Sequence, residues 1–142
     1  AQSISQHFGA KADSCYQRIY TSSHLAKHPT QKVEAIQLSH FAQDSAQMPG
    51  VEMVLRLAVR LRGQYTWHTP ALCTQRGAKL SCGIECDGGR FDVVARTNSS
   101  ILITGGSDIY FNDCDASKRV LRRAPDDKVF LLHQMPLSNC MH

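Results

Sequence analysis

The clearest pattern in the chain is an alternation over residues 51–62, in which every odd position is apolar and most even positions are charged. Valine, methionine and leucine occupy the odd positions, and the even positions include Arg56, Arg60 and Arg62. A helix would scatter both sets around its circumference, whereas successive side chains of a strand point to opposite faces. The segment is therefore predicted to be an antiparallel strand with one face in the core and the other in water.

Further segments show weaker strand patterns, separated by turn signals such as Met48-Pro49-Gly50 and Asp87-Gly88-Gly89. No helical crossover lies between them, which indicates an antiparallel meander. We predict a mainly β fold, either a small antiparallel barrel or a sandwich of about eight strands, because both protect the edges of their sheets. The predicted strands are 32–41, 51–62, 70–75, 79–85, 90–97, 100–104, 108–112 and 128–133.

The N-terminal part of the chain shows a different pattern. Residues 1–12 are polar and aperiodic, and we expect them to form a flexible arm. Residues 13–142 are predicted to form a single β-rich domain with an N-terminal helix over 14–28. Asp13 is suited to cap that helix, and Pro29 ends it because the residue before a proline is pushed out of the helical region.

Composition and charge narrow the class of protein. The 142 residues are 42% hydrophobic and 20% charged, which is typical of one globular domain. The formal net charge of +4 falls short of the dense basic surface of a nucleic-acid binder, so no nucleic acid is expected as a partner. No apolar run approaches the ~20 residues that span a bilayer, and no transmembrane segment is predicted.

Cysteine usage points to the compartment. An even number of cysteines in a small chain favours disulfides formed in an oxidising compartment. The opening Ala1-Gln2-Ser3, without an initiator methionine, is typical of a mature protein whose signal peptide has been removed. We therefore expect a periplasmic or secreted protein. The six cysteines are Cys15, Cys73, Cys82, Cys86, Cys114 and Cys140.

One disulfide follows from the register of a hairpin. Gly77-Ala78 suits a two-residue turn with glycine first. Counting outward from that turn places Cys73 opposite Cys82 at a non-hydrogen-bonded pair, where the Cα atoms approach to ~4.5 Å. That distance is within disulfide reach, so a Cys73–Cys82 bridge is predicted to staple the hairpin.

The other cysteines are less constrained. Cys82 and Cys86 lie ~13 Å apart along an extended strand, beyond the ~7 Å limit for a disulfide. Cys86 must then pair with Cys15, Cys114 or Cys140. Our hypothesis joins Cys15 to Cys140 and Cys86 to Cys114, although the register argument fixes only the first bridge.

Three segments have spacings that partly fit a metal site. The spacing Cys82-x3-Cys86 fits a loose zinc pair, but no second compact pair accompanies it. His24 and His28 are suitably spaced to share a metal on a helix, yet the following glutamate of a zinc hydrolase is absent, and either ring can simply pack or be solvated. The segment from Asp113 lacks the glycine and glutamate of a calcium loop. No metal or other cofactor is predicted.

Catalytic motifs are also missing from the sequence. It contains no Gly-x-Ser-x-Gly elbow, P-loop or dinucleotide-binding glycine pattern. Several carboxylates sit near the predicted turns, where such residues usually cap the turn rather than act as acid and base. Gly105 and Gly106 favour a bend or bulge between strands. We therefore predict a protein that is not an enzyme.

Basic and aromatic residues supply the candidate binding surface. The arginines could contact an acidic protein surface or an anionic envelope polymer, or could simply form solvated faces. Trp67 lies in the loop-like connection Gly63–Pro70, where it would act as a contact anchor if exposed and cap the core if buried. The basic groups are Arg56, Arg60 and Arg62 on one strand, and Arg119, Arg122 and Arg123 after the 108–112 strand.

Two resemblances accompany this interpretation. The opening Cys15-Tyr-Gln-Arg-Ile-Tyr20, followed by a β-rich half, resembles small exported bacterial proteins of uncharacterised function. Separately, Cys86-Asp-Gly-Gly-Arg-Phe91 and Cys140 resemble the small β-barrels of periplasmic lysozyme inhibitors. That family inserts a Ser-Gly-x-x-Tyr loop into the lysozyme cleft, and the nearest match is Gly105-Gly-Ser-Asp-Ile-Tyr110, which implies roles for Ser107 and Tyr110.

Taken together, these features predict a non-enzymatic binding protein of the bacterial cell envelope. One alternative is a periplasmic inhibitor of a lysozyme-like hydrolase that acts through loop 105–110. Another is a carrier that holds a small apolar ligand inside a barrel, which requires an interior that leucine, methionine and phenylalanine do not fill.

Overall fold

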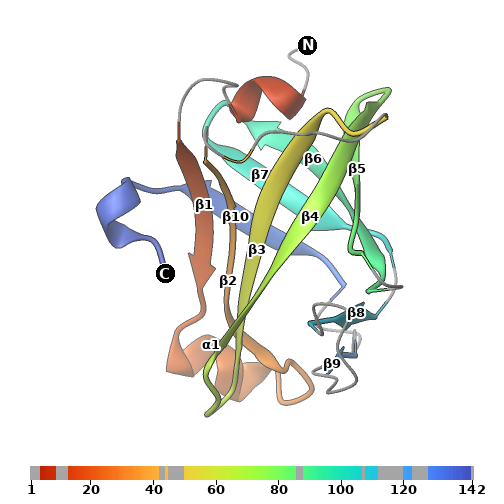
Figure 1. Ribbon diagram of the computed structural model, residues 1–142. Coiled ribbons are helices and arrows are strands. Elements are labelled where there is room, and N and C mark those ends of the chain that lie inside the picture. Colours follow the sequence, from red (N-terminus) through yellow and green to blue (C-terminus); the bar gives the residue numbers. More distant parts are fainter. Residues whose placement is uncertain are drawn as a thin grey trace.

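The computed structural model is a closed antiparallel barrel of 8 strands (Figure 1). The strands follow one another around the barrel in sequence order from β1 to β7, and β10 closes the ring by pairing with both β7 and β1. The structure describes residues 4–8, 13–41, 44, 50–85, 88–106, 108–111, 120–122 and 128–141. The barrel strands are β1 (Ser14–Ile19), β2 (Val33–His40), β3 (Met53–Leu61), β4 (Thr66–Arg76), β5 (Lys79–Gly83), β6 (Arg90–Thr97), β7 (Ser100–Thr104) and β10 (Phe130–Gln134).

The predicted mainly β fold is confirmed, and the barrel is the observed alternative. In β3 the odd positions, such as Leu55 and Leu57, are fully buried, whereas Arg56 on the opposite face is exposed. The same alternation recurs in β6 and β10, because each strand sends one set of side chains into the barrel. A one-sided alternating pattern was therefore a sound predictor of these strands.

The predicted helix over 14–28 is wrong in its first half. Ser14–Ile19 form β1, which pairs with β2 along its whole length, from Ser14 opposite His40 to Ile19 opposite Ala35. Helix α1 is limited to Ser22–Lys27, and Thr21 caps it by accepting a hydrogen bond from the His24 backbone N–H. Pairing with β2 satisfies the backbone groups of β1, and this tertiary contact overrides the local capping signal.

The predicted flexible arm also differs from the structure where the structure describes it. Ile4–His7 form a 3-10 helix, η1, and the side chains of Ile4 and Phe8 are 0% exposed. The His7 ring nitrogen Nε2 lies 2.7 Å from the Thr97 carbonyl oxygen, and the Tyr16 hydroxyl donates to the His7 carbonyl oxygen. Burial also raises the pKa of Tyr16. Residues 4–8 thus close one end of the barrel, hereafter the η1 end (Figure 1).

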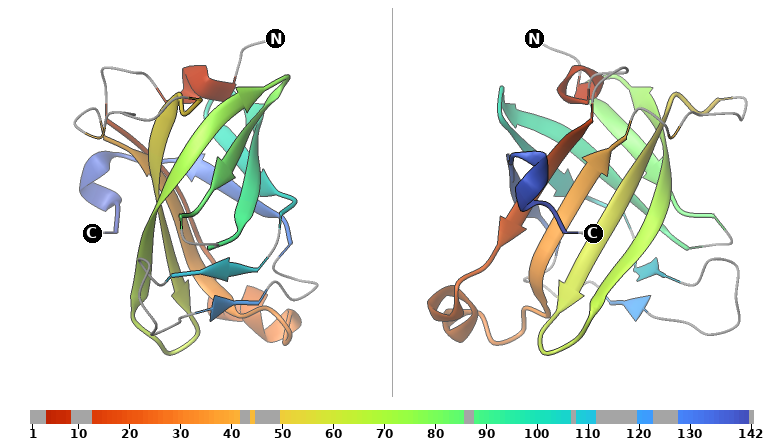
Figure 2. Two further views of the ribbon diagram at one scale, coloured as in Figure 1. Left: turned by 45° about the vertical axis from the view of Figure 1, so that its right-hand side comes forward. Right: turned by 60° about the vertical axis from the view of Figure 1, so that its left-hand side comes forward.

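A short strand pair extends the core at the opposite end, hereafter the α1 end (Figure 2). Strands β8 (Ile109–Tyr110) and β9 (Val120–Leu121) pair there, and the side chains of Ile109 and Leu121 are buried. The chain leaves the barrel at Gly105 and Gly106, which both have positive φ; a Cβ at Gly106 would collide with the Arg90 carbonyl oxygen. These glycines form the predicted bend.

Two predicted disulfides are confirmed. Cys73 faces Cys82 across β4 and β5, with Cα atoms 4.1 Å apart, and Gly77 in the turn has positive φ. Cys15 on β1 bonds to Cys140, which follows the 3-10 helix η3 (Leu137–Asn139). The proposed Cys86–Cys114 bridge lies outside the described residues.

Candidate binding surface

The interior of the barrel is filled with side chains. An open cavity able to hold a ligand would leave exposed surface on the side chains that line it. The inward side chains in the middle of the barrel are at most 1% exposed, as in an ordinary close-packed protein core. They are Leu38, Leu55, Leu57, Val59, Leu80, Phe91, Val93, Ile101, Ile103, Phe130 and Leu132.

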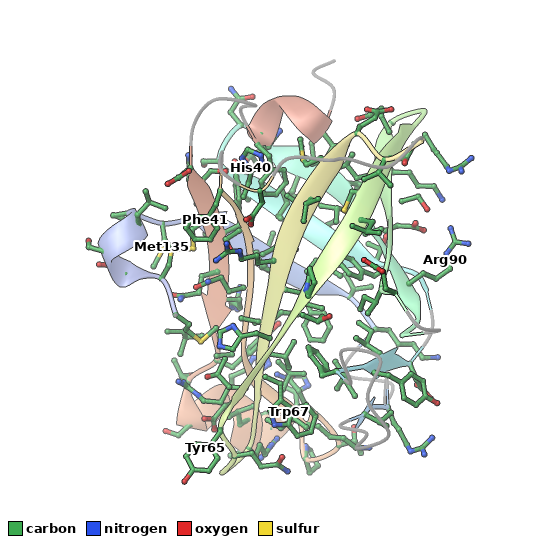
Figure 3. All side chains as sticks on the ribbon, viewed as in Figure 1. His40, Phe41, Tyr65, Trp67, Arg90 and Met135 are labelled. Carbon is green, nitrogen blue, oxygen red and sulfur yellow. A yellow bond between two sulfur atoms is a disulfide. The ribbon has the colours of Figure 1, made fainter. Side chains whose placement is uncertain are left out.

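Arg56 and Arg60 lie on the outside of β3, as predicted, but each already has an acidic partner. The Arg56 guanidinium donates to both carboxylate oxygens of Asp44, at 2.7 and 2.9 Å, and lies 4.4 Å from the centre of the Phe41 ring. The hydrogen bond to Asp44 raises the pKa of Arg56 further above its usual value. Arg60 Nε lies 2.6 Å from Glu34 Oε1. Both guanidinium groups are therefore already paired with carboxylates of the same chain. Phe41 is labelled in Figure 3.

Arg62 holds the connection between α1 and β2. Its guanidinium donates to three backbone carbonyl oxygens, those of Leu25 at 3.0 Å, His28 at 2.8 Å and Gln31 at 2.6 Å. A positive charge suits the carbonyl end of a helix, and the planar guanidinium reaches several acceptors at once. The geometry assigns Arg62 a structural role in this connection.

Replacing Arg62 by alanine is expected to lower the free energy of unfolding by about 1–2 kcal/mol, because three carbonyl oxygens lose a charged donor but regain water. Arg96→Ala, at an exposed position of β6, is the matched control and is expected to change stability by about 0.5 kcal/mol or less. Urea unfolding of both variants gives the comparison. Equal stability of the two variants would contradict the structural role.

The second basic group and the loop of the inhibitor resemblance are only partly described. Arg122 is exposed, and its Nη1 lies 3.7 Å from Asp108 Oδ2, whereas Arg119, Arg123 and Ser107 lie outside the described residues. Ile109 is buried, and Tyr110 is half-buried opposite Val120. Ile109 and Tyr110, at the end of loop 105–110, thus belong to the β8–β9 pair.

Trp67 belongs to a strand rather than to the predicted loop Gly63–Pro70. Strand β4 begins at Thr66, and Trp67 pairs opposite Val59 with its ring centre 5.7 Å from that of Phe111. It packs against the core at the α1 end, which matches the capping interpretation. Tyr65, just before β4, is the exposed aromatic residue at 87% (Figure 3).

The rings of His24, in α1, and His28, at its C-terminal cap, stack against each other. The ring centres of His24 and His28 are 4.3 Å apart with an interplanar angle of 23°, and the centre of the Tyr20 ring lies 4.8 Å from that of His24. His24 Nε2 is 3.1 Å from Gln31 Oε1. Within the described part of the chain, no group of three or more His, Cys, Asp or Glu side chains is arranged to hold a metal ion.

A surface that the sequence interpretation missed lies on the outside of β6, β7 and β10. Val94 is opposite Leu102, and Leu102 is opposite Leu131, so that three half-buried apolar side chains form a row across these strands. Val129, two residues before Leu131, and Ile19 on the neighbouring β1 extend the row, and they are 56% and 55% exposed. We call these five residues the outer apolar stripe. No alternating pattern in residues 128–133 marked this surface, because residues 129–132 are all apolar.

The described residues include no helix with the length and apolar character needed to cross a membrane. Comparisons with protein-family models, with curated proteins and with solved structures find no match for this chain.

Proposed function

We propose that the chain is a non-enzymatic binding protein that works in an oxidising compartment, the periplasm or the cell exterior, and contacts its partner through the outside of the barrel. The observation that carries this proposal is the filled interior. Side chains such as Leu57, Phe91 and Phe130 leave no open surface along the barrel axis. Eight-stranded barrels either fill with side chains or hold one small ligand, and packing of this kind favours a rigid scaffold over a carrier.

The disulfides support the compartment and the scaffold role. Formation of the bridges Cys73–Cys82 and Cys15–Cys140 requires oxidation of four thiols, which an oxidising compartment supplies. A scaffold that is rigid before binding loses little conformational entropy when its partner docks, which favours affinity.

The test compares the wild-type protein with a variant that has an artificial cavity. Phe130→Ala opens space inside the barrel, and apolar cavities of this kind take up benzene. Benzene is expected to raise the Tm of Phe130→Ala and to leave that of the wild type unchanged. Leu57→Ala is the second cavity variant in case Phe130→Ala does not fold.

Stabilisation of the wild type by benzene, to the extent seen in the cavity variant, would favour the carrier and overturn the proposal. The complementary measurement is native mass spectrometry of protein recovered from its own cell envelope without denaturation. The mass of the bare oxidised chain is expected. A small molecule retained by the protein would also favour the carrier and overturn the proposal.

A further inference from the structure

We propose that the outer apolar stripe is the docking site for a partner protein whose contact surface combines apolar side chains with carboxylates. This inference rests on the outer-surface function proposed above and names the face and the partner chemistry.

The geometry of the stripe suits the centre of an interface. Neighbouring strands lie ~4.8 Å apart, so the row from Val94 through Leu102 to Leu131 spans ~10 Å, and Ile19 on β1 adds a fourth strand. The inward residues between them are fully buried in the core, so the stripe residues are not needed to fill the barrel. A contiguous apolar patch with a polar border is typical of an interaction site.

The border of the stripe is cationic. Lys79 on β5 lies opposite Val94, and Arg96 lies two residues from Val94 on β6, where the register with β7 shifts between Ala95 and Thr97. The neighbouring carboxylate, Asp92, already accepts a hydrogen bond from Lys79 Nζ at 3.2 Å. Arg96 is exposed to solvent. A partner with carboxylates around an apolar centre would complement this charge and be steered toward it.

Charge argues against a second copy of the chain as the occupant. In a two-fold symmetric contact the same patch meets itself. Lys79 and Arg96 would then approach the same cationic border of the other copy, and the one carboxylate of the described border, Asp92, is already paired with Lys79. Like charges brought together in an interface suppress that association.

The shape of the face argues against a lipid surface. Side chains that enter a bilayer, such as tryptophan, phenylalanine and leucine, protrude from the protein. Ile19 and Val129, at one end of the stripe, are more than half exposed, but its central residues Val94, Leu102 and Leu131 are half-buried in the sheet. A flat membrane would meet Lys79 and Arg96 before it reached the apolar row, whereas the side chains of a protein surface can fill the space between them.

The experiment uses a random peptide library displayed on phage, selected against the immobilised oxidised protein. We expect the enriched peptides to carry apolar residues next to aspartate or glutamate. Arg96→Glu and Leu102→Thr are each expected to weaken the binding of a synthetic enriched peptide by about tenfold. Threonine keeps the preference for a strand, so Leu102→Thr changes the face with little effect on the fold.

Two matched controls separate this face from the rest of the barrel. Lys27→Glu makes the same charge reversal at an exposed position of α1, and Leu72→Thr makes the same substitution on the outside of β4. Neither control is expected to change peptide affinity. Circular dichroism and thermal unfolding verify that all four variants are folded.

The other occupants give distinct results. Loss of vesicle binding by Arg96→Glu, measured with phosphatidylglycerol vesicles, would assign the face to a membrane, and a dimer that Leu102→Thr dissociates would assign it to a second copy. Enriched peptides that bind all variants equally would overturn the stripe as the site but leave outer-surface binding standing. A library that yields no saturable binder counts against both proposals.

Discussion

Replacing Cys15 and Cys140 together by alanine is expected to lower the free energy of unfolding by about 5 kcal/mol. The bridge joins residues separated by 125 positions, so it closes most of the chain into one loop. Reconnecting so long a loop costs the unfolded chain more entropy than closing a short one. A loss of this size is a large part of the total stability of a typical domain. Urea unfolding of the double variant, compared with the oxidised wild type, measures the difference.

The Cys73–Cys82 bridge provides the matched comparison, because its sequence separation is only 9. Alanine at both of these positions is expected to cost about 3 kcal/mol, less than loss of the long-range bridge. Using double variants avoids a free thiol that could pair incorrectly. A larger loss from the hairpin bridge would show that native contacts, rather than loop closure, determine what each disulfide contributes.

The Cys15–Cys140 bridge also positions the C-terminal segment over the outside of β1 and β2. The Gln17 amide donates to the Asn139 carbonyl oxygen at 3.2 Å, and Gln37 exchanges two hydrogen bonds with the backbone of Met141, at 2.6 and 3.0 Å. In the double alanine variant we expect the Met141 amide to exchange with solvent faster, because this segment would no longer be tethered. The loss of stability and the faster amide exchange are then two independent measures of what the Cys15–Cys140 bridge contributes.

Most of the barrel could be predicted from the sequence because its strands have one buried and one exposed face. In β3 the contrast between Val59 and Arg60 is visible in adjacent residues, so the period of the pattern identifies the element without any tertiary information. The Cys73–Cys82 bridge could also be predicted without tertiary information. The position of the turn sets the register of a hairpin, so the residue pairs can be counted outward from it.

The first strand was missed because both of its faces are covered. Tyr16 points into the barrel, and Gln17 on the opposite face is buried beneath the C-terminal segment, so the alternation is not visible as apolar against polar. Short segments of this kind resemble a helix and a strand equally. Only the pairing with β2, between residues distant in the sequence, decides between them.

The candidate binding surface depended on contacts that no local pattern shows. The arginines of β3 looked available in the sequence, but Asp44 and Glu34 on other segments reach Arg56 and Arg60. The outer apolar stripe was hidden for the opposite reason. Phe130, Leu131 and Leu132 form a continuous apolar run, and only the barrel register separates the inward residues from the outward Leu131.

Phe8→Ala is expected to lower the free energy of unfolding by about 3–5 kcal/mol, the usual cost of truncating a buried phenylalanine. The side chain is 0% exposed and packs edge-on against the Tyr16 ring, with ring centres 5.2 Å apart. Its removal would leave a cavity at the η1 end of the barrel. A flexible arm, in contrast, would tolerate the change with an effect of about 0.5 kcal/mol or less.

Two further variants make this measurement specific. Phe8→Leu keeps most of the apolar volume and is expected to cost less than about 1.5 kcal/mol. Tyr65→Ala removes an aromatic ring of similar size from an exposed position and is expected to have little effect. Because Trp67 packs at the α1 end against Phe111 (Figure 3), its fluorescence in folded Phe8→Ala is expected to match that of the wild type. A shift in that emission under native conditions would mean that η1 supports the whole barrel rather than the end it covers.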